Sequence, residues 1–163
     1  NSSYIFFYQT AETKQVGLVT GVNWWSLLSW LSGAGGDELA RLPEGREPLE
    51  LVRHADVLLY GIGRAMDLAQ RRGLSRVEQE TLREEGAVAE ALGFYLSADG
   101  RVVGGGSSLA FKPEDIGRKN RAAAVAAGRA KAEAILAVCA HHPHKLLVVD
   151  EGAALRMIEL LRR

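Results

Sequence analysis

The stretch Ala122-Ala-Ala-Val-Ala-Ala-Gly-Arg-Ala-Lys-Ala-Glu-Ala-Ile-Leu-Ala-Val-Cys-Ala140 decides the fold that we expect for this chain. Residues 122–127 are small and apolar, which is typical of a buried strand, and Gly128 interrupts the run. The residues that follow are strong helix formers, among them alanine, leucine and glutamate. The pattern therefore predicts a strand that passes through glycine into a helix.

The start of this predicted helix is a candidate anion site. The unpaired backbone N–H groups of a helix N-terminus and the helix dipole both favour a negative group there. Lys131 lies in this first turn, where the dipole disfavours a cation. A phosphate between the lysine and the helix end explains that position. A solvated lysine on an ordinary helix also explains it, and this stretch leaves both interpretations open.

Strands and helices alternate around this stretch. Residues 56–60 and 145–149 are apolar runs typical of buried strands, and each leads towards a predicted helix. This alternation predicts an α/β fold, a Rossmann-like and mostly parallel sheet flanked by helices. Ligands of such sheets bind outside the carboxyl ends of the strands. Asp150 and Gly128 follow two of those ends.

Gly61 and Gly63 follow the strand predicted at residues 56–60, and we expect them to form a second junction from strand through glycine into helix. They are ligand-binding candidates because of this place at a strand end. The signal is weak, since Met66 stands where the dinucleotide-binding fingerprint requires its third glycine.

Arg71 and Arg72 end the helix that we expect after these glycines. Arginines near a helix C-terminus are favourable with the dipole and need no other role. As a pair they are also able to bind a phosphate through forked hydrogen bonds.

Glu90 is the carboxylate of greatest interest. An apolar stripe from Val88 to Tyr95, spaced at helical intervals, predicts a helix with Glu90 away from the stripe. The carboxylate is then either solvated or directed into a cleft, and the sequence does not decide between the two.

Other local signals predict further elements. They are strands at Tyr4–Tyr8 and Val16–Thr20, a helix with an apolar stripe at Trp24–Leu31, a capping box formed by Ser75 and Glu78, and a hairpin turn at Ala98-Asp-Gly100.

The composition indicates one globular domain. The 163 residues are 47% hydrophobic and 25% charged, and 20 basic side chains balance 20 acidic ones. Zero net charge argues against direct binding of nucleic acid or an anionic membrane. The single cysteine, Cys139, excludes a disulfide within the chain and fits a reducing compartment, so we expect a cytoplasmic protein. No run has the length of a transmembrane helix.

Two absences are also expected. His141, His142 and His144 lie close together, but no carboxylate or cysteine accompanies them at a zinc-like spacing, so we expect no metal site. We expect no cofactor.

The chain begins at Asn1 without an initiator methionine or a signal peptide, which we interpret as a fragment or a processed form.

Six stretches of the chain share their order, and closely their spacing, with the motifs of one family. They are residues 55–65, 69–73, 86–95, 98–103, 126–135 and 149–154. On these stretches, about the last two thirds of the chain resembles the C-terminal effector-binding domain of SorC/DeoR-type bacterial transcription regulators. Within that group it is most similar to the central glycolytic gene regulators.

The resemblance implies a fold related to sugar-phosphate isomerases and a phosphorylated sugar as effector, such as fructose 1,6-bisphosphate. It implies that Arg71 and Lys131 bind phosphates, that Glu90 accepts hydrogen bonds from sugar hydroxyls, and that Gly128 and its neighbours supply backbone N–H groups. It also implies a homodimer or tetramer, and contact with operator DNA through a helix-turn-helix that these residues do not contain.

The chain departs from the family in three places. The family usually has Gly-Gly-Ser-Ser-Lys where this chain has Ala127-Gly-Arg-Ala-Lys131. Val22, Asn23 and Trp24 stand where a second phosphate loop has glycine and hydroxyl side chains. The domain, which we place at residues 1–163, is shorter than its relatives and looks truncated or rearranged over residues 1–50.

Three functions are therefore compared. The first is an effector domain that binds a sugar phosphate without turnover and has no catalytic residue. The second is an isomerase-like enzyme, which would need a general base such as Glu90 or Asp150. The third is a degenerate domain that keeps only its oligomer contacts. We expect the first.

Overall fold

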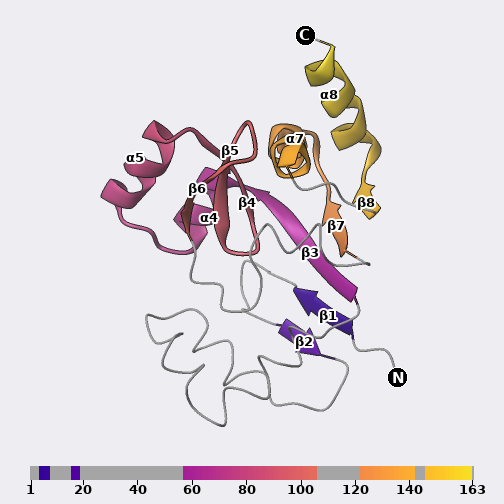
Figure 1. The fold of residues 1–163 in the computed structure, drawn as a ribbon, viewed down its shortest axis with the longest axis horizontal. Helices are drawn as coiled ribbons and strands as arrows, with labels where there is room; N and C mark the ends of the chain where they lie inside the picture. Colours follow the sequence, from indigo (N-terminus) through magenta and orange to yellow (C-terminus); the bar gives the residue numbers. More distant parts are fainter. Residues whose placement is uncertain (1–3, 8–15, 19–56, 106–121, 142–145, 163) are drawn as a thin grey trace.

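The computed structural model describes residues 4–7, 16–18, 57–105, 122–141 and 146–162 (Figure 1). In chain order the elements are β1 (Tyr4–Phe7), β2 (Val16–Leu18), β3 (Val57–Arg64), α4 (Ala65–Arg71), α5 (Arg76–Glu84), β4 (Ala87–Ala91), β5 (Phe94–Ser97), β6 (Val102–Gly105), β7 (Ala122–Ala126), the 3₁₀ turn η1 (Arg129–Lys131), α7 (Ala132–His141), β8 (Leu146–Val149) and α8 (Glu151–Leu161). The helix expected at Trp24–Leu31, the altered residues 22–24 and His142 to His144 lie outside the described residues.

The central strand β3 belongs to both halves of a mixed sheet. Its first half pairs in parallel with β1 and with β7, and β7 pairs in parallel with β8. Its last three residues pair antiparallel with β4, which continues through β5 to β6. With the antiparallel pair β1–β2, three described pairs are parallel and four are antiparallel. The α/β class is confirmed, but the expectation of a mostly parallel sheet is wrong.

The antiparallel half replaces a predicted helix. Where the apolar stripe predicted a helix from Val88 to Tyr95, the chain forms β4, a two-residue turn and β5. The turn residues Leu92 and Gly93 both have positive φ, 55° and 89°, as the favoured hairpin turns require. The run is apolar at nearly every position, so its helical spacing was a chance match within a strand pattern.

The second glycine junction is also different from the prediction. β3 continues through Gly61 and Gly63 to Arg64, and α4 begins at the next residue, Ala65. The glycines are strand residues because β7 pairs with Gly61 and β4 pairs with Gly63. The junction at Gly128, in contrast, is confirmed, since β7 precedes it and η1 and α7 follow.

Helix α7 covers one face of the sheet. Ile135 and Val138 of α7 are fully buried against that face. The strand side chains buried in the same core are Leu58, Tyr60, Ile62, Ala89, Ala91, Phe94, Leu96, Ala122, Ala124 and Ala126. The many alanines let helix and strands approach closely. Every second side chain of β3 and β4 points into this core, so the side chains between them point to the opposite face of the sheet.

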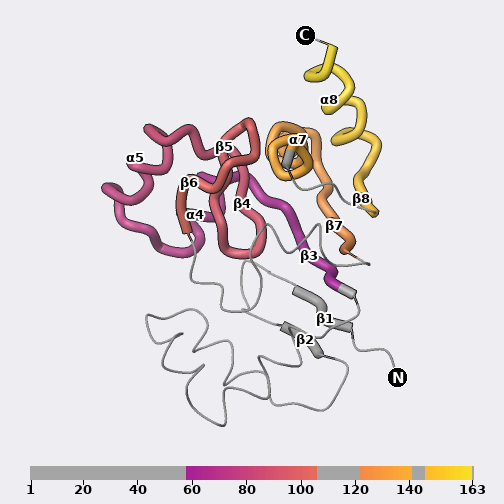
Figure 2. Tube along the Cα trace, viewed as in Figure 1, coloured from indigo at the N-terminus to yellow at the C-terminus, as the bar shows by residue number. Residues whose placement is uncertain are grey.

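A smaller core lies under α4 and α5. It contains Ala65, Ala69, Leu82 and Tyr95. Figure 2 shows residues 65–105 on one side and residues 122–162 on the other, with β3 running between them. Among the described residues, no helix is long and apolar enough to cross a membrane.

Candidate functional site

The sheet register places three of the predicted site residues on one face. Glu90 is directly opposite Gly63 in the antiparallel pair of β3 and β4, and Gly61 lies two residues earlier in β3. Because side chains alternate along a strand, all three belong to the face opposite α7. Gly61 is exposed, and a Cβ atom added there would meet only the carbonyl oxygen of Val125, at 3.8 Å. The side chain of Leu68 occupies the space beside Gly63.

The carboxylate of Glu90 is buried rather than solvated, with 4% of the residue exposed. Its Oε1 accepts a hydrogen bond from Nη2 of Arg72 at 2.8 Å and another from the N–H of Gly93 at 2.7 Å. Burial raises the pKa of Glu90, while the Arg72 guanidinium and the Gly93 N–H oppose that rise. The site therefore holds a buried carboxylate together with its counter-ion.

Tyr95 extends this buried polar group. It is opposite Glu90 in the pair of β4 and β5, and 3% of the residue is exposed. Among the described residues its Oη has no hydrogen-bond partner. Burial raises the pKa of the Tyr95 phenol, and the positive charge of Arg72 opposes the rise. The local sequence singled out neither residue: Arg72 was considered only as one of a pair with Arg71, and Tyr95 only as the end of an apolar stripe.

The two adjacent arginines have different environments. Arg71 is the last residue of α4 and is exposed, with no ion pair to another described residue. Arg72 is the C-cap of the same helix and pairs with Glu90. Arg71 is thus free to meet an anion from solvent, whereas Arg72 is committed to the carboxylate.

The loop after β7 is the second part of the site. Gly128 has φ +104° and caps η1, and Lys131 ends this turn immediately before α7. The N–H of Gly128 donates to Oδ2 of Asp150 at 2.9 Å. The resemblance assigns this N–H to a phosphate, whereas in this structure it is bonded to the carboxylate of Asp150.

Asp150 and Glu159 connect this loop to α8. Oδ1 of Asp150 accepts the N–H of Ala153 at 2.8 Å and caps the helix. The N–H groups of Ala153 and then Gly128 hold the pKa of Asp150 below its ordinary value, and Lys131 adds to this effect. Arg129 of the loop pairs with Glu159 at 2.8 Å. The loop is therefore fixed at the carboxyl ends of the parallel strands β7 and β8, where the sequence placed it.

The described residues contain no group of three histidine, cysteine, aspartate or glutamate side chains that could hold a metal ion. What they offer a ligand is a bare glycine surface at Gly61, a buried carboxylate at Glu90, an exposed cation at Arg71 and a half-buried one at Lys131. Such a combination suits a ligand with hydroxyl groups and negative charge.

Comparison with known proteins identifies the family. Residues 34–159 match the family described as "putative sugar-binding domain". The chain belongs to this sugar-binding domain family of SorC/DeoR-type regulators. The resemblance stated from the six sequence stretches is thereby confirmed.

Two relatives of this family domain are central glycolytic genes regulators. The chain is 36% identical to the protein from Bacillus subtilis over 128 residues, which are 78% of this chain and 38% of that protein. It is 33% identical to the protein from Priestia megaterium over 116 residues, 71% of this chain and 34% of that protein. The chain thus spans little more than a third of these relatives. Both are named as regulators of genes rather than as enzymes.

Solved structures of the family share the fold. A SorC family regulator from Enterococcus faecalis superposes with a TM-score of 0.70 at 32% identity, over 75% of this chain and 50% of that one. The full-length sorbitol operon regulator SorC from Klebsiella pneumoniae gives a TM-score of 0.64 at 17% identity, over 74% of this chain and 41% of that one. The second likeness concerns the fold alone.

Proposed function

We propose that this chain is the effector-binding domain of a bacterial transcription regulator and that its effector is a phosphorylated sugar such as fructose 1,6-bisphosphate. The observation that carries the proposal is the buried carboxylate of Glu90, which lies on the same face of the sheet as the bare strand surface at Gly61. A buried carboxylate that is paired and hydrogen-bonded selects ligands that donate hydrogen bonds. The membership in a sugar-binding family supports the same class of ligand.

The proposed roles follow from position. Glu90 accepts hydrogen bonds from sugar hydroxyls, while Arg71 and Lys131 bind phosphate groups from the solvent side. Gly128 and its neighbours shape the second phosphate site. We also propose that the fold is related to that of sugar-phosphate isomerases, and that residues 1–163 form a single domain.

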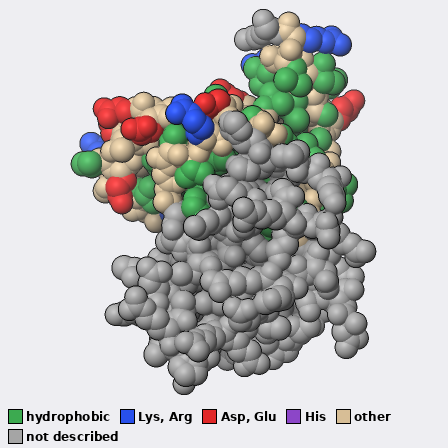
Figure 3. Space-filling model, in the orientation of Figure 1, with side chains coloured by type: hydrophobic (Ala, Val, Ile, Leu, Met, Phe, Trp, Pro, Cys, Tyr) green, Lys and Arg blue, Asp and Glu red, His purple; other side chains and the backbone are tan. Residues whose placement is uncertain are grey.

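The regulation that we propose is a shift between arrangements of subunits. A ligand changes an equilibrium only by its differential affinity for the two states. We propose a homodimer or tetramer, with DNA bound through a helix-turn-helix domain outside these residues. Apolar side chains gather over α8 (Figure 3), where Leu155, Ile158 and Leu161 are exposed, and such a patch supports contact with a second subunit. Sedimentation with and without the sugar phosphate tests this assembly, and a monomer in both cases contradicts it.

A second candidate has a specific observation in its favour. The N–H of Gly128 is already bonded to Asp150, and Arg129 and Ala130 stand where the family has hydroxyl side chains. A domain that keeps its fold but binds no sugar would have these features. A ligand-binding measurement separates the two candidates.

The first test is a thermal melt of the chain with fructose 1,6-bisphosphate, with fructose 6-phosphate and inorganic phosphate as controls. Ligand at about 100 times its dissociation constant adds about 2.7 kcal/mol of stability, a shift of several degrees. A shift selective for a sugar phosphate supports the effector domain. A cooperative melt that none of these ligands moves supports the degenerate domain.

Lys131→Ala tests the phosphate site directly. We expect the variant to bind fructose 1,6-bisphosphate more weakly by about 1.5–3 kcal/mol, because a charge-assisted hydrogen bond is lost. Calorimetric titration measures the change. Arg76→Ala, which removes an exposed cation at the start of α5, is the matched control and should bind as the wild type does. Equal affinity of the Lys131 variant and the wild type would remove Lys131 from the site.

A further inference from the structure

The end of helix α4 carries two arginines, and one of them, Arg72, pairs with a buried carboxylate while its own side chain stays partly exposed. We infer that Arg72 is a positioning residue that fixes one carboxylate oxygen of Glu90 and so presents the other to a hydroxyl group of the ligand. This inference rests on the proposed function and deepens it. It separates Arg72 from Arg71, which we have assigned to a phosphate.

The hydrogen bonds of Glu90 converge on a single oxygen. Nη2 of Arg72 lies 2.8 Å from Oε1, and the N–H of Gly93 lies 2.7 Å from the same atom. No hydrogen bond from another described residue reaches Oε2. Two donors on one oxygen fix the plane of the carboxylate and leave the second oxygen as an acceptor.

The backbone holds Arg72 in place for this contact. Arg72 is the C-cap of α4, and its N–H donates to the carbonyl oxygen of Leu68 at 2.9 Å. The N–H of Leu74 donates to the carbonyl oxygen of Ala69 at 3.0 Å. Gly93 belongs to the tight turn between β4 and β5. The arginine and the turn therefore approach Glu90 from separate fixed elements, which is the arrangement that a preorganised binding group needs.

The surroundings of Glu90 make a cation necessary. The groups that face it are Arg72 from α4, the Gly93 N–H from the turn and the buried phenol of Tyr95 from β5. The negative charge of Glu78 from α5 also raises the pKa of that phenol. Burial raises the pKa of Glu90, and Arg72 supplies the only positive charge among these groups. Without it the carboxyl would take up a proton at higher pH and lose strength as an acceptor.

The sign of the expected pH dependence follows. Removal of Arg72 raises the pKa of Glu90 further, so at low pH the variant holds a protonated carboxyl that accepts hydrogen bonds poorly. As the pH rises, the carboxyl ionises and affinity recovers. A role of Arg72 in stability alone would lower affinity, if at all, by a factor that does not change with pH.

The test is a titration of the full chain with fructose 1,6-bisphosphate between about pH 6 and about pH 8, for wild type, Arg72→Met and Arg72→Lys. We expect Arg72→Met to bind about 10 to 100 times more weakly than wild type at the lower pH, and the ratio to shrink as the pH rises. Arg72→Lys keeps the charge and should recover most of the affinity. Arg76→Met is the matched control on α5 and should match the wild type throughout.

Each other outcome counts against the inference. Wild-type affinity for Arg72→Met at every pH overturns it, and so does a weakening that is constant with pH. If Arg72→Met does not fold, Arg72→Gln, which keeps a polar group without the charge, carries the same expectation. Failure of the wild type to bind fructose 1,6-bisphosphate or fructose 6-phosphate would instead reject the proposed function, and this inference with it.

Discussion

Two glycines beside the same loop should respond in opposite ways to an added methyl group. Gly128 has φ +104° and ψ 131°, a conformation that residues with a Cβ atom rarely adopt. Gly152 lies in the first turn of α8, and a Cβ atom there would be 3.8 Å from the nearest atom, the backbone nitrogen of Arg129. We expect Gly128→Ala to lower the free energy of unfolding by about 1–3 kcal/mol and Gly152→Ala to raise it by about 0.4–1 kcal/mol.

Urea denaturation measures both changes, and each variant is the control for the other. A loss of stability in Gly152→Ala equal to that in Gly128→Ala would show that crowding in the loop, rather than the backbone angle, decides the outcome.

At the same scale, the place in the fold of some candidate residues could be predicted from the sequence, and that of others could not. Gly128 could be found because a small apolar run ends at it, which is a local signal. The place of Glu90 beside Gly63 could not be found, because these two residues are 27 positions apart in the chain and are brought together by the register of two strands, a non-local property. Arg71 and Arg72 are adjacent and chemically identical, so only the packing of α4 decides which one meets the carboxylate.

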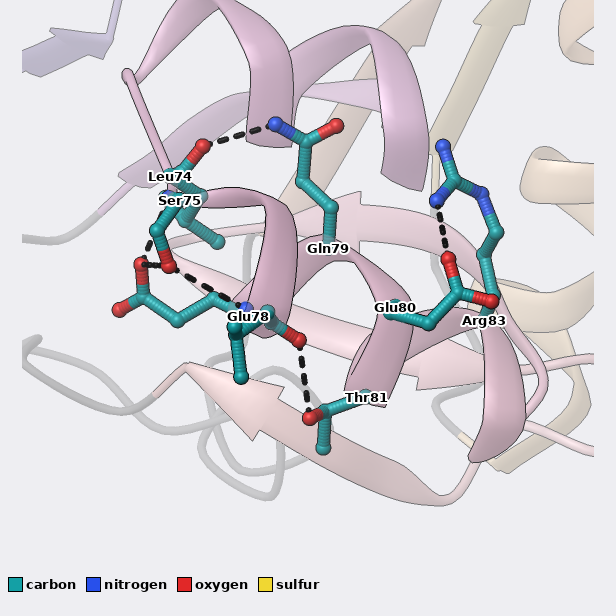
Figure 4. A network of polar contacts seen from close by, with 8 residues as sticks. Leu74, Ser75, Glu78, Gln79, Glu80, Thr81 and Arg83 are labelled. Atoms are coloured by element: carbon teal, nitrogen blue, oxygen red, sulfur yellow. Dashed lines mark hydrogen bonds and ion pairs between the residues drawn. The ribbon is translucent and has the colours of Figure 1, made fainter.

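At the scale of the element, the capping box that opens α5 should contribute measurable stability (Figure 4). Oγ of Ser75 accepts the N–H of Glu78 at 3.3 Å, and Oε2 of Glu78 accepts the N–H of Ser75 at 2.7 Å. We expect Ser75→Ala to lower the free energy of unfolding by about 0.5–2 kcal/mol, because the N–H of Glu78 loses its acceptor.

The matched control lies in the same helix. The hydroxyl of Thr81 donates to the carbonyl oxygen of Val77. That oxygen also serves as an acceptor in the backbone hydrogen bonds of the helix, so Thr81→Ala should change stability by less than about 0.5 kcal/mol. Thermal or urea unfolding distinguishes the variants. A loss in Thr81→Ala as large as that in Ser75→Ala would mean that α5 is stabilised by its surface bonds rather than by its cap.

The elements that were predicted correctly are those with local signals. The capping box at Ser75 and the turn at Asp99 and Gly100 both fix their own geometry within a few residues. The segment 88–95 was wrongly predicted as a helix because its alanines fit either period. What decides its structure is the turn at Leu92 and Gly93 together with the partners that β3 and β6 provide.

At the scale of the whole molecule, the two halves of β3 explain why the sheet was predicted to be mostly parallel although it is mixed. Alternating strands and helices predicted parallel pairs, and those pairs exist along the first half of β3 and along β7. The antiparallel half depends on a strand, β4, that the sequence did not reveal. The ligand-binding candidates lie on both halves, since Glu90 belongs to the antiparallel one and Lys131 to the end of the parallel one.

The titration of the molecule's carboxylates should make its stability fall in acid. Within the described ranges, four carboxyls have a lowered pKa: Glu78, Asp99, Asp150 and Glu159. A lowered folded-state pKa means that the unfolded chain binds protons first as the pH falls, so their stabilisation is present above the unfolded pKa values and is lost below them. Glu90 has a raised pKa and acts in the opposite direction, so it offsets part of the loss.

Asp99 provides the sharpest check of this linkage. Its Oδ1 accepts the hydroxyl of Ser97 at 2.5 Å and its Oδ2 accepts Nε of Arg101 at 2.6 Å; the Ser97 hydroxyl first, and then Arg101, lower the pKa of Asp99 to about 2. The stability difference between wild type and Asp99→Asn should therefore be constant near neutral pH and shrink as the pH falls from about 4 to about 2. Urea denaturation across that range measures it. A difference that stayed constant down to about pH 2 would contradict the linkage. It would mean that protonation of Asp99 costs the wild type no stability, so the turn would be held by hydrogen bonds that do not depend on the charge of Asp99.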